Sequence, residues 1–165
     1  MKIRDKILPV LKPSGGEEEI EAVSEVIKSG WWGKGPKVEE FEEKFAQMVG
    51  VKHALAVSSA SHGQDLVMKA LNMSKIDVIN PAQSFIATAM IPLWNDYTSN
   101  IVDVLPDTLC LDPDEIIKYK KKNSEILIAV NHAGVSADYK KIRNNFGGFI
   151  IEDTAHSCYA NGAGK

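Results

Sequence analysis

The sequence is poor in cysteine, and this scarcity excludes two classes of protein. Only two cysteines, Cys110 and Cys158, occur in 165 residues, and they lie far apart along the chain. Such a pair forms neither a disulfide framework nor the closely spaced motif of a structural zinc site. We therefore expect two reduced thiols and no bound metal.

An excess of charge of one sign is also lacking. The 19 Lys and Arg residues against 22 Asp and Glu residues give a formal net charge of −3, whereas proteins that bind nucleic acid carry Lys and Arg in clustered excess. No apolar run approaches the roughly 18 to 20 residues that cross a bilayer, and the N-terminus lacks the order of a signal peptide. We therefore expect a cytoplasmic protein that binds neither nucleic acid nor membrane.

The sequence does contain an alternation of short apolar runs with helical stretches. Two helices are expected first, over 17–28 and from Pro36 to Gly50, with a loop between them. Strands are then expected at 53–57, 77–80, 100–104, 126–130 and 149–152, with linking helices at 62–71, 84–94, 113–122 and 139–146. This alternation is typical of an α/β fold in three layers, with a mostly parallel sheet and helices on both faces.

In such a sheet, ligands bind beyond the carboxyl ends of the strands, where helix N-termini also point. After the first expected strand, Ser59 or Ser61 can cap the next helix, and hydroxyls with free N–H groups there would hold a phosphate. An ordinary helix cap explains these residues equally well, because Gly63 alone makes neither a Walker loop nor a dinucleotide fingerprint. After the second strand, Phe85 could offer its ring to a flat ligand or pack in the core.

The last expected strand ends with two carboxylates, Glu152 and Asp153, and His156 follows one turn later. A buried carboxylate is costly unless it meets a cation, which could be a metal, an arginine or the protonated nitrogen of a heteroaromatic cofactor. Alternatively, Glu152 faces solvent and Asp153 caps the next turn. His132 could join Asp153 and His156 around a metal, but no spacing resembles a two-histidine helix motif.

Six segments together carry a resemblance to a known family. They are LKPSGGEEEI (11–20), SGWWGKGP (29–36), VSSAS (57–61), DVINP (77–81), SFIATA (84–89) and IEDTAH (151–156). In order and spacing they resemble the DegT/DnrJ/StrS sugar aminotransferases, which are pyridoxal-phosphate enzymes of fold type I. The resemblance implies an N-terminal helix with an active-site loop at 1–36 and part of the cofactor-binding large domain at 37–165.

The resemblance implies pyridoxal 5′-phosphate as the cofactor and relates five residues to it. Ala60 and Ser61 stand where the family holds the cofactor phosphate at a helix N-terminus, and Phe85 stands where an aromatic ring stacks on the pyridine. Asp153 matches the aspartate that pairs with the pyridinium nitrogen and keeps the ring an electron sink. His156 matches a His or Gln near the phenolic oxygen of the cofactor.

By the same resemblance, the full-length enzyme is a homodimer that transfers an amino group, usually from glutamate, to a keto-sugar nucleotide. Asn131 stands where the family commonly has His, and Gly63 and Gln64 replace an apolar pair, so these departures bear on substrate preference. Trp31 and Trp32 belong to a loop near the family's active site and dimer contact. Substrate contact and plain packing are both open for these two tryptophans, and substrate contact is also a candidate role for Asn131.

The chain ends at Lys165, before the segment that carries the family's Schiff-base lysine, and Lys165 is not expected to take that role. We therefore expect the N-terminal portion of an enzyme, inactive alone, without the later strands and the small C-terminal domain. Two alternatives remain: a dehydratase of the same family, in which histidine replaces the lysine, and a non-catalytic binding domain. The next stretch of the gene, with its Lys, His or stop codon, would distinguish them.

Overall fold

The computed structural model describes residues 12–158, and this part of the chain divides into two compact units between Ala56 and Val57. Lys165 and the first residue of the LKPSGGEEEI segment lie outside the described residues. Among the described helices, none has both the length and the apolar character that crossing a membrane requires.

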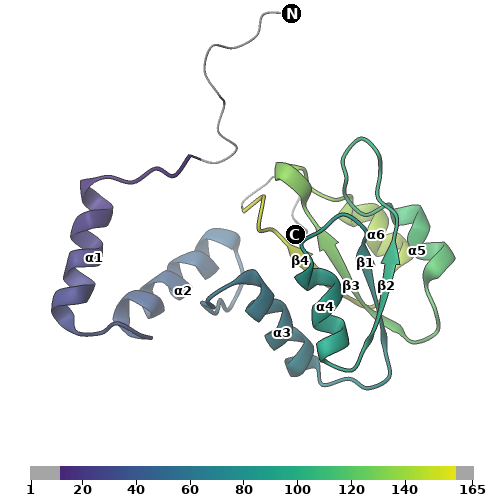
Figure 1. Ribbon diagram of the computed structural model, residues 1–165, viewed down its shortest axis with the longest axis horizontal. Helices are drawn as coiled ribbons and strands as arrows, with labels where there is room; N and C mark the ends of the chain where they lie inside the picture. The colour runs from purple at the N-terminus through teal and green to yellow at the C-terminus, as the bar shows by residue number, and fades with distance from the viewer. Residues whose placement is uncertain (1–11, 159–165) are drawn as a thin grey trace, which may run out of the picture. The chain divides into compact units, whose positions relative to one another are not determined.

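The first unit contains two helices, α1 (Glu17–Ser29) and α2 (Pro36–Val49), shown in Figure 1. Acidic residues in the first turn of α1 stabilise the positive end of its helix dipole. One of them, Glu19, accepts a hydrogen bond of 2.6 Å from Gly16 N through its carboxylate. The helix ends where Gly30 adopts a φ of 78°, a left-handed conformation that side chains disfavour. Both helices form where the sequence predicts them.

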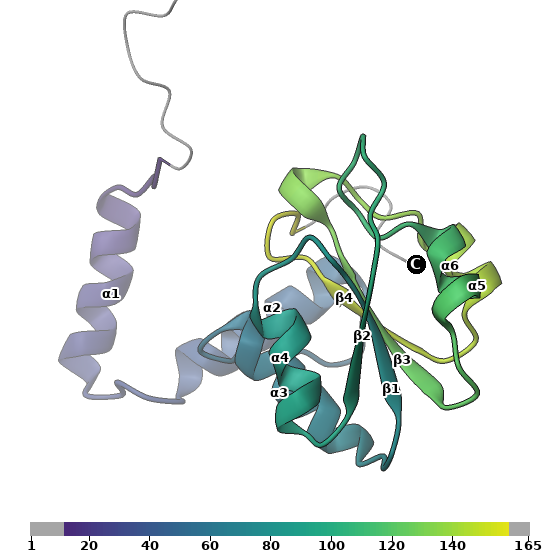
Figure 2. The same ribbon diagram turned by 45° about the vertical axis from the view of Figure 1, so that its right-hand side comes forward.

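The second unit is a parallel sheet with its connecting helices. Its elements in chain order are α3 (Ala60–Leu71), β1 (Asp77–Pro81), α4 (Ala87–Trp94), β2 (Thr98–Val102), α5 (Pro113–Tyr119), β3 (Ser124–Val130), the 3-10 helix η1 (His132–Gly134), α6 (Tyr139–Asn145) and β4 (Phe149–Asp153). The strands lie in the order β2-β1-β3-β4, and all neighbours are parallel. Figures 1 and 2 show α3 and α4 on one face of the sheet and α5 and α6 on the other. The predicted α/β fold is confirmed.

The central strands β1 and β3 are buried on both faces. Val78, Ile126 and Ile128 belong to a hydrophobic cluster that includes side chains of α3 and α4. Ile79 and Leu127 belong to a second cluster, with side chains of α5 and α6. All five side chains are 0% exposed. Because successive strand residues point to opposite faces, these strands need a helix layer on each side of the sheet.

One strand expected from the sequence does not form. Residues 53–57 have no regular secondary structure, and no described strand pairs with them. Leu55 in this segment is 63% exposed. A strand requires a hydrogen-bonded neighbour to satisfy its backbone, so an alternating sequence pattern is insufficient by itself. The prediction of a strand at 53–57 is wrong for the described chain.

A second difference concerns the strand expected at 100–104. The strand observed is Thr98–Val102, because these five residues pair in register with β1 from Asp77 to Pro81. Val104 instead forms an isolated antiparallel bridge with Leu111. The chain therefore turns back on itself directly after β2 before it enters α5.

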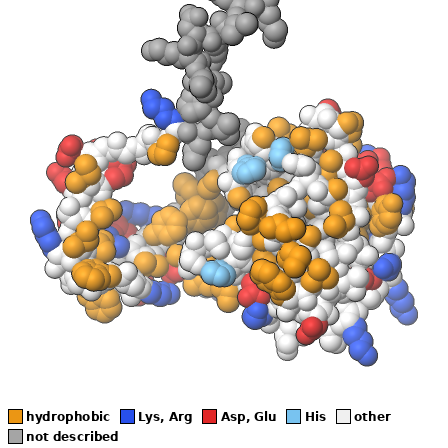
Figure 3. Space-filling view, in the orientation of Figure 1, with side chains coloured by type: hydrophobic (Ala, Val, Ile, Leu, Met, Phe, Trp, Pro, Cys, Tyr) orange, Lys and Arg blue, Asp and Glu red, His pale blue; other side chains and the backbone are white. Residues whose placement is uncertain are grey.

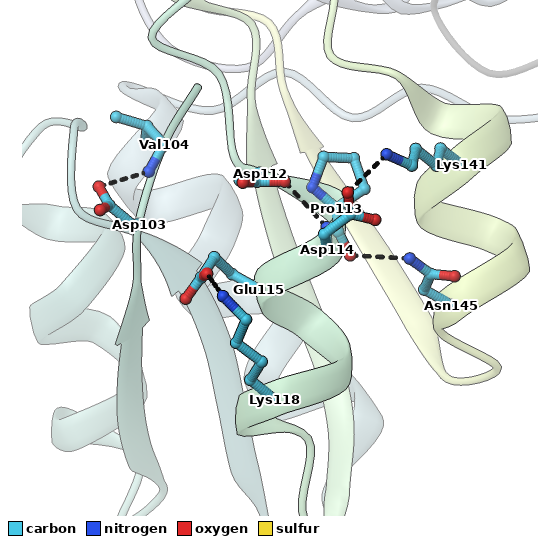
Figure 4. Close-up of polar contacts among 9 residues, drawn as sticks. All are labelled: Asp103, Val104, Asp112, Pro113, Asp114, Glu115, Lys118, Lys141 and Asn145. Carbon is cyan, nitrogen blue, oxygen red and sulfur yellow. Dashed lines mark hydrogen bonds and ion pairs between the residues drawn. The ribbon is translucent and has the colours of Figure 1, made fainter. Parts of the chain in front are cut away.

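The helices α5 and α6 are joined by polar contacts at the start of α5 (Figure 4). Lys141 Nζ contacts Asp114 Oδ2 at 2.8 Å, and Asn145 Nδ2 donates to Pro113 O at 2.8 Å. The Asp112 carboxylate caps α5 by accepting a hydrogen bond of 2.9 Å from Asp114 N. These contacts link the two helices that cover the sheet face opposite α3 and α4.

The turn into β4 depends on a glycine that lies against the backbone of β3. A Cβ on Gly148 would overlap the carbonyl of Glu125 and the ring of Phe146. We expect Gly148→Ala to lower the free energy of unfolding of the full-length protein by about 2 kcal/mol, the usual cost of overpacking. Urea denaturation measures this change.

The neighbouring Gly147 provides the matched control, because a Cβ there would meet nothing within 4 Å. Gly147→Ala should change the free energy of unfolding by less than about 0.5 kcal/mol. Equal stabilities of the two variants would show that the turn moves away from β3 at no cost.

Candidate functional site

The strands of the second unit are parallel, so their carboxyl ends all lie at the same end of the sheet, which is called the carboxyl edge here. Because β1, β3 and β4 are parallel neighbours, the residues that follow these strands lie along the same edge. Figure 2 shows the connections after β1, β2 and β3 at one end of the sheet. The site residues that the sequence predicts on this edge are Phe85, Asn131, Asp153 and His156.

The N-terminus of α3 has the geometry of an anion-binding helix start. Ser59 is the N-cap, and its Oγ accepts a hydrogen bond of 3.2 Å from His62 N, while Ser58 Oγ hydrogen-bonds to His62 Nδ1. The capping interpretation is therefore correct for Ser59. Ala60 and Ser61 are the first two helical residues, whose N–H groups have no intrahelical acceptor. These two N–H groups can bind an anion such as a phosphate.

Asp153 ends β4, and both oxygens of its carboxylate accept hydrogen bonds. Oδ1 accepts from Ala155 N at 3.1 Å. Asp153 therefore caps the turn that follows β4, which is one of the two roles expected from the sequence. Oδ2 accepts from Gln64 Nε2 at 2.8 Å, a contact between α3 and β4. The side chain is half-buried. Asp153 thus caps a turn and also faces the helix that carries the anion-binding N-terminus.

The carboxylate of Asp153 has no cationic partner among the described residues. Within residues 12–158, no ion pair includes Asp153. A half-buried carboxylate that already accepts hydrogen bonds gains further from a positively charged neighbour, which offsets more of its desolvation. The protonated ring nitrogen of pyridoxal phosphate is a suitable cation for Asp153. The free N–H groups at the α3 N-terminus are suitable donors for the phosphate of the same cofactor. The donor set therefore fits this cofactor.

The sequence relates Gln64 to substrate preference and not to the cofactor. It lies on the buried side of α3 with Met68, four residues later, and is only 6% exposed. Its Nε2 donates to Asp153, whereas its Oε1 has no hydrogen-bond partner among the described residues. A polar residue on the apolar face of a helix was the available signal, since buried amides require partners.

Next to Asp153, Glu152 is part of a buried polar network. Asn131 is 0% exposed, and its Nδ2 donates to Glu152 Oε1 at 3.0 Å. Asn131 Oδ1 accepts from Ala137 N and from the Tyr139 hydroxyl, both at 2.9 Å. Glu152 is therefore tied into the protein rather than simply facing solvent. Substrate contact by Asn131 stays a prediction, and its amide is already engaged at both ends.

His156 and Phe85 differ in how firmly they are held. His156 Nδ1 accepts a hydrogen bond of 3.3 Å from Ala133 N, and its ring lies edge-on to that of His132, with 5.7 Å between the ring centroids. The Phe85 side chain is 70% exposed, so it does not pack in the core. Within the described residues, no group of three or more His, Cys, Asp and Glu side chains is arranged to hold a metal ion.

Exposed apolar side chains occur in the connection after β1 and at the C-terminal end of α4. Figure 3 shows hydrophobic side chains gathered on one face of the second unit, beside two histidine side chains. The exposed members in this part of the chain are Phe85, Ile86, Leu93 and Trp94, which are 70%, 67%, 48% and 67% exposed. An exposed aromatic ring at the strand edge is available to a flat ligand.

Trp31 and Trp32 belong to the first unit. They are 61% and 77% exposed, and Trp32 Nε1 donates to Ile27 O at 3.1 Å. The two tryptophans therefore follow the C-terminal end of α1 with their rings largely free of the unit's own packing. A substrate contact for them stays a prediction.

The family comparison gives an independent identification. The model of the DegT/DnrJ/EryC1/StrS aminotransferase family matches residues 13–165, which confirms the resemblance seen in the sequence. Among solved structures, a Streptococcus pneumoniae protein described as a sugar aminotransferase, in its pyridoxamine phosphate (PMP) form, is alike in fold. Its TM-score is 0.86 at 24% identity, over 92% of this chain and 43% of that chain.

Two further solved structures are also similar. The E. coli GDP-4-keto-6-deoxy-D-mannose-3-dehydratase with bound hydrated pyridoxal phosphate (PLP) has a TM-score of 0.83 at 25% identity, over 94% of this chain and 42% of its own. NtdA from Bacillus subtilis with bound PMP has a TM-score of 0.79 at 28% identity, over 86% and 33%. The bound cofactors agree with the cofactor expected from the sequence. The chain spans between about a third and about two fifths of the length of these structures.

The network around Asn131 predicts a specific loss of stability at high pH. Burial, and then the negative charge of Glu152, raise the pKa of Tyr139 far above its usual value of 10.0. The unfolded chain releases this phenolic proton near pH 10, whereas the folded protein keeps it, so this contribution to stability is lost as the pH rises above about 10. Between pH 10 and 11, the free energy of unfolding of the wild type should fall by about 1 kcal/mol more than that of Tyr139→Phe.

Urea denaturation at the two pH values measures the difference. The matched control is Tyr119→Phe, because the Tyr119 side chain is 51% exposed. Tyr119→Phe should follow the wild type. A parallel pH dependence in the wild type and Tyr139→Phe would contradict the assignment of this effect to Tyr139.

Proposed function

The chain belongs to the DegT/DnrJ/EryC1/StrS aminotransferase family, and we propose that it supplies the main non-covalent cofactor contacts of a pyridoxal-phosphate-dependent sugar aminotransferase. The observation that carries the proposal is the hydrogen bond of 2.8 Å between Gln64 and Asp153. It brings the anion-binding N-terminus of α3 and the carboxylate at the end of β4 into one site. Segments 1–36 and 37–165 act as the helix with active-site loop and as part of the large domain.

In this proposal the N-terminus of α3 binds the cofactor phosphate. The N–H groups of Ala60 and Ser61 donate to it, and the Ser61 hydroxyl is free for the same purpose because Ser59 makes the helix cap. The positive end of the helix dipole adds to the attraction. The phosphate is thereby held by backbone as well as by side chains.

The ring of the cofactor is held from three directions. Asp153 would accept a hydrogen bond from the ring N–H and favour the protonated nitrogen, Phe85 would lie against the ring face, and His156 would lie near the phenolic oxygen. A protonated ring withdraws electrons and stabilises negative charge at the substrate carbon. The carboxylate of Asp153, held by Ala155 N and Gln64, would accept the hydrogen bond of the ring N–H at a fixed position.

We further propose that the amino group comes from an amino acid, glutamate in the first instance, and goes to a keto-sugar nucleotide. Trp31 and Trp32 are the proposed substrate contacts, and the assembled enzyme is a cytoplasmic homodimer in nucleotide-sugar biosynthesis. The support is the family match and the similarity to solved sugar-modifying proteins.

A sugar dehydratase with the same cofactor is the second candidate. The observation in its favour is the E. coli dehydratase, which is 25% identical over 94% of this chain. The residue at the Schiff-base position distinguishes the two, because lysine there indicates an aminotransferase and histidine indicates the dehydratase.

The proposal predicts that, of the residues in this chain, Asp153 contributes most to the rate of the reaction. In the full-length protein, Asp153→Asn keeps the side-chain shape and removes the negative charge that holds the ring proton. The PLP-loaded variant should convert L-glutamate to 2-oxoglutarate roughly a thousandfold more slowly than the wild type. Single-turnover measurement of 2-oxoglutarate gives this rate.

Asp114→Asn is the matched control, since Asp114 is an exposed carboxylate paired with Lys141 on the opposite helix layer. It should leave the rate unchanged within about twofold, because surface ion pairs contribute little. Near-normal turnover in Asp153→Asn would mean that Asp153 is only a turn cap.

A further inference from the structure

Gln64 is the one side chain of α3 that hydrogen-bonds to the carboxylate of Asp153. It is 6% exposed and projects from a helix whose other buried side chain is Met68. Since an ionised carboxylate can only accept hydrogen bonds, the amide must present Nε2 to Asp153 Oδ2, and its Oε1 is turned away. The orientation of the amide therefore follows from the charge of its partner.

The contact completes a two-point support of the carboxylate. Ala155 N binds Oδ1 at 3.1 Å from the chain that follows β4, and Gln64 Nε2 binds Oδ2 at 2.8 Å from α3. One donor alone would leave the carboxylate free to rotate about its side-chain bonds, whereas two donors on different oxygens fix its plane. Two oxygens offer about four acceptor positions, so both remain able to accept a further N–H.

The same helix contributes to both ends of the proposed cofactor site. Its first residues, Ala60 and Ser61, stand at the anion-binding N-terminus, and Gln64 follows within about one turn. A displacement of α3 would therefore move the phosphate donors and the support of Asp153 together. This arrangement couples the two binding features through a rigid element.

We propose that Gln64 is a positioning residue that fixes the carboxylate of Asp153 toward the ring nitrogen of the bound cofactor. This inference rests on the proposed function. Gln64 also departs from the apolar residue that the family resemblance implies at this position. In this role Gln64 acts through Asp153.

The test uses pyridoxamine phosphate labelled with ¹⁵N at the ring nitrogen, because this form binds without a covalent bond to lysine. Gln64→Met keeps the length of the side chain and removes the donor. In the full-length protein it should weaken the Kd for pyridoxamine phosphate about tenfold. The pH at which the bound ring nitrogen loses its proton should fall by about one unit, as the ¹⁵N shift reports.

A double-mutant cycle with Asp153→Asn tests whether Gln64 acts through Asp153. In the Asp153→Asn background, Gln64→Met should change the Kd by less than about twofold. The matched control is Gln47→Met, an exposed glutamine of α2, which should match the wild type. If Gln64→Met does not fold, Gln64→Leu is carried through the same cycle.

The outcomes separate the inference from the proposed function. If Asp153→Asn loses affinity while the Gln64 variants keep the wild-type Kd and ring-nitrogen titration, Gln64 only packs, and the inference is overturned. Equal effects of Gln64→Met in both backgrounds also overturn it, because Gln64 then acts independently of Asp153. If Asp153→Asn itself changes neither measurement, the proposed function fails, and the inference fails with it.

Discussion

Burial of β1 and β3 on both faces is the constraint on which the second unit depends. Val78 and Ile79 are neighbours in sequence, yet they belong to different hydrophobic clusters. Each side chain can leave water only if a helix layer covers its own face of the sheet. Helices must therefore connect the strands as crossovers, which makes the strands parallel and gathers their carboxyl ends at one edge.

This gathering creates the site and also its electrostatic imbalance. Asp153 lies at the end of β4, half-buried, with two hydrogen-bond donors and no cation in the described chain. The N-terminus of α3, one layer away, carries N–H groups without acceptors. A ligand with a negative group at one end and a protonated nitrogen at the other would bind the free N–H groups with the first and the Asp153 carboxylate with the second. A phosphorylated pyridine has both groups.

The two acidic residues at the end of β4, Glu152 and Asp153, have different roles. Glu152 accepts from Asn131, whose other amide atom binds Tyr139 and Ala137, so this carboxylate belongs to the internal structure of the protein. Asp153, one residue later, turns toward α3 because alternate strand residues face opposite sides. Two adjacent acidic residues thus serve different functions, and the period of the strand separates them.

Local pattern and motif order determined the helices α1 and α2, the alternation of strands and helices, the family, and the candidate roles of Ser61, Phe85, Asp153 and His156. The tertiary structure decided what depends on partners distant in sequence. Residues 53–57 form no strand because no described strand pairs with them, and Asn131 is engaged inside the protein. Gln64 meets Asp153 although 89 positions separate them, since packing of α3 beside the sheet, rather than any local spacing, sets that distance.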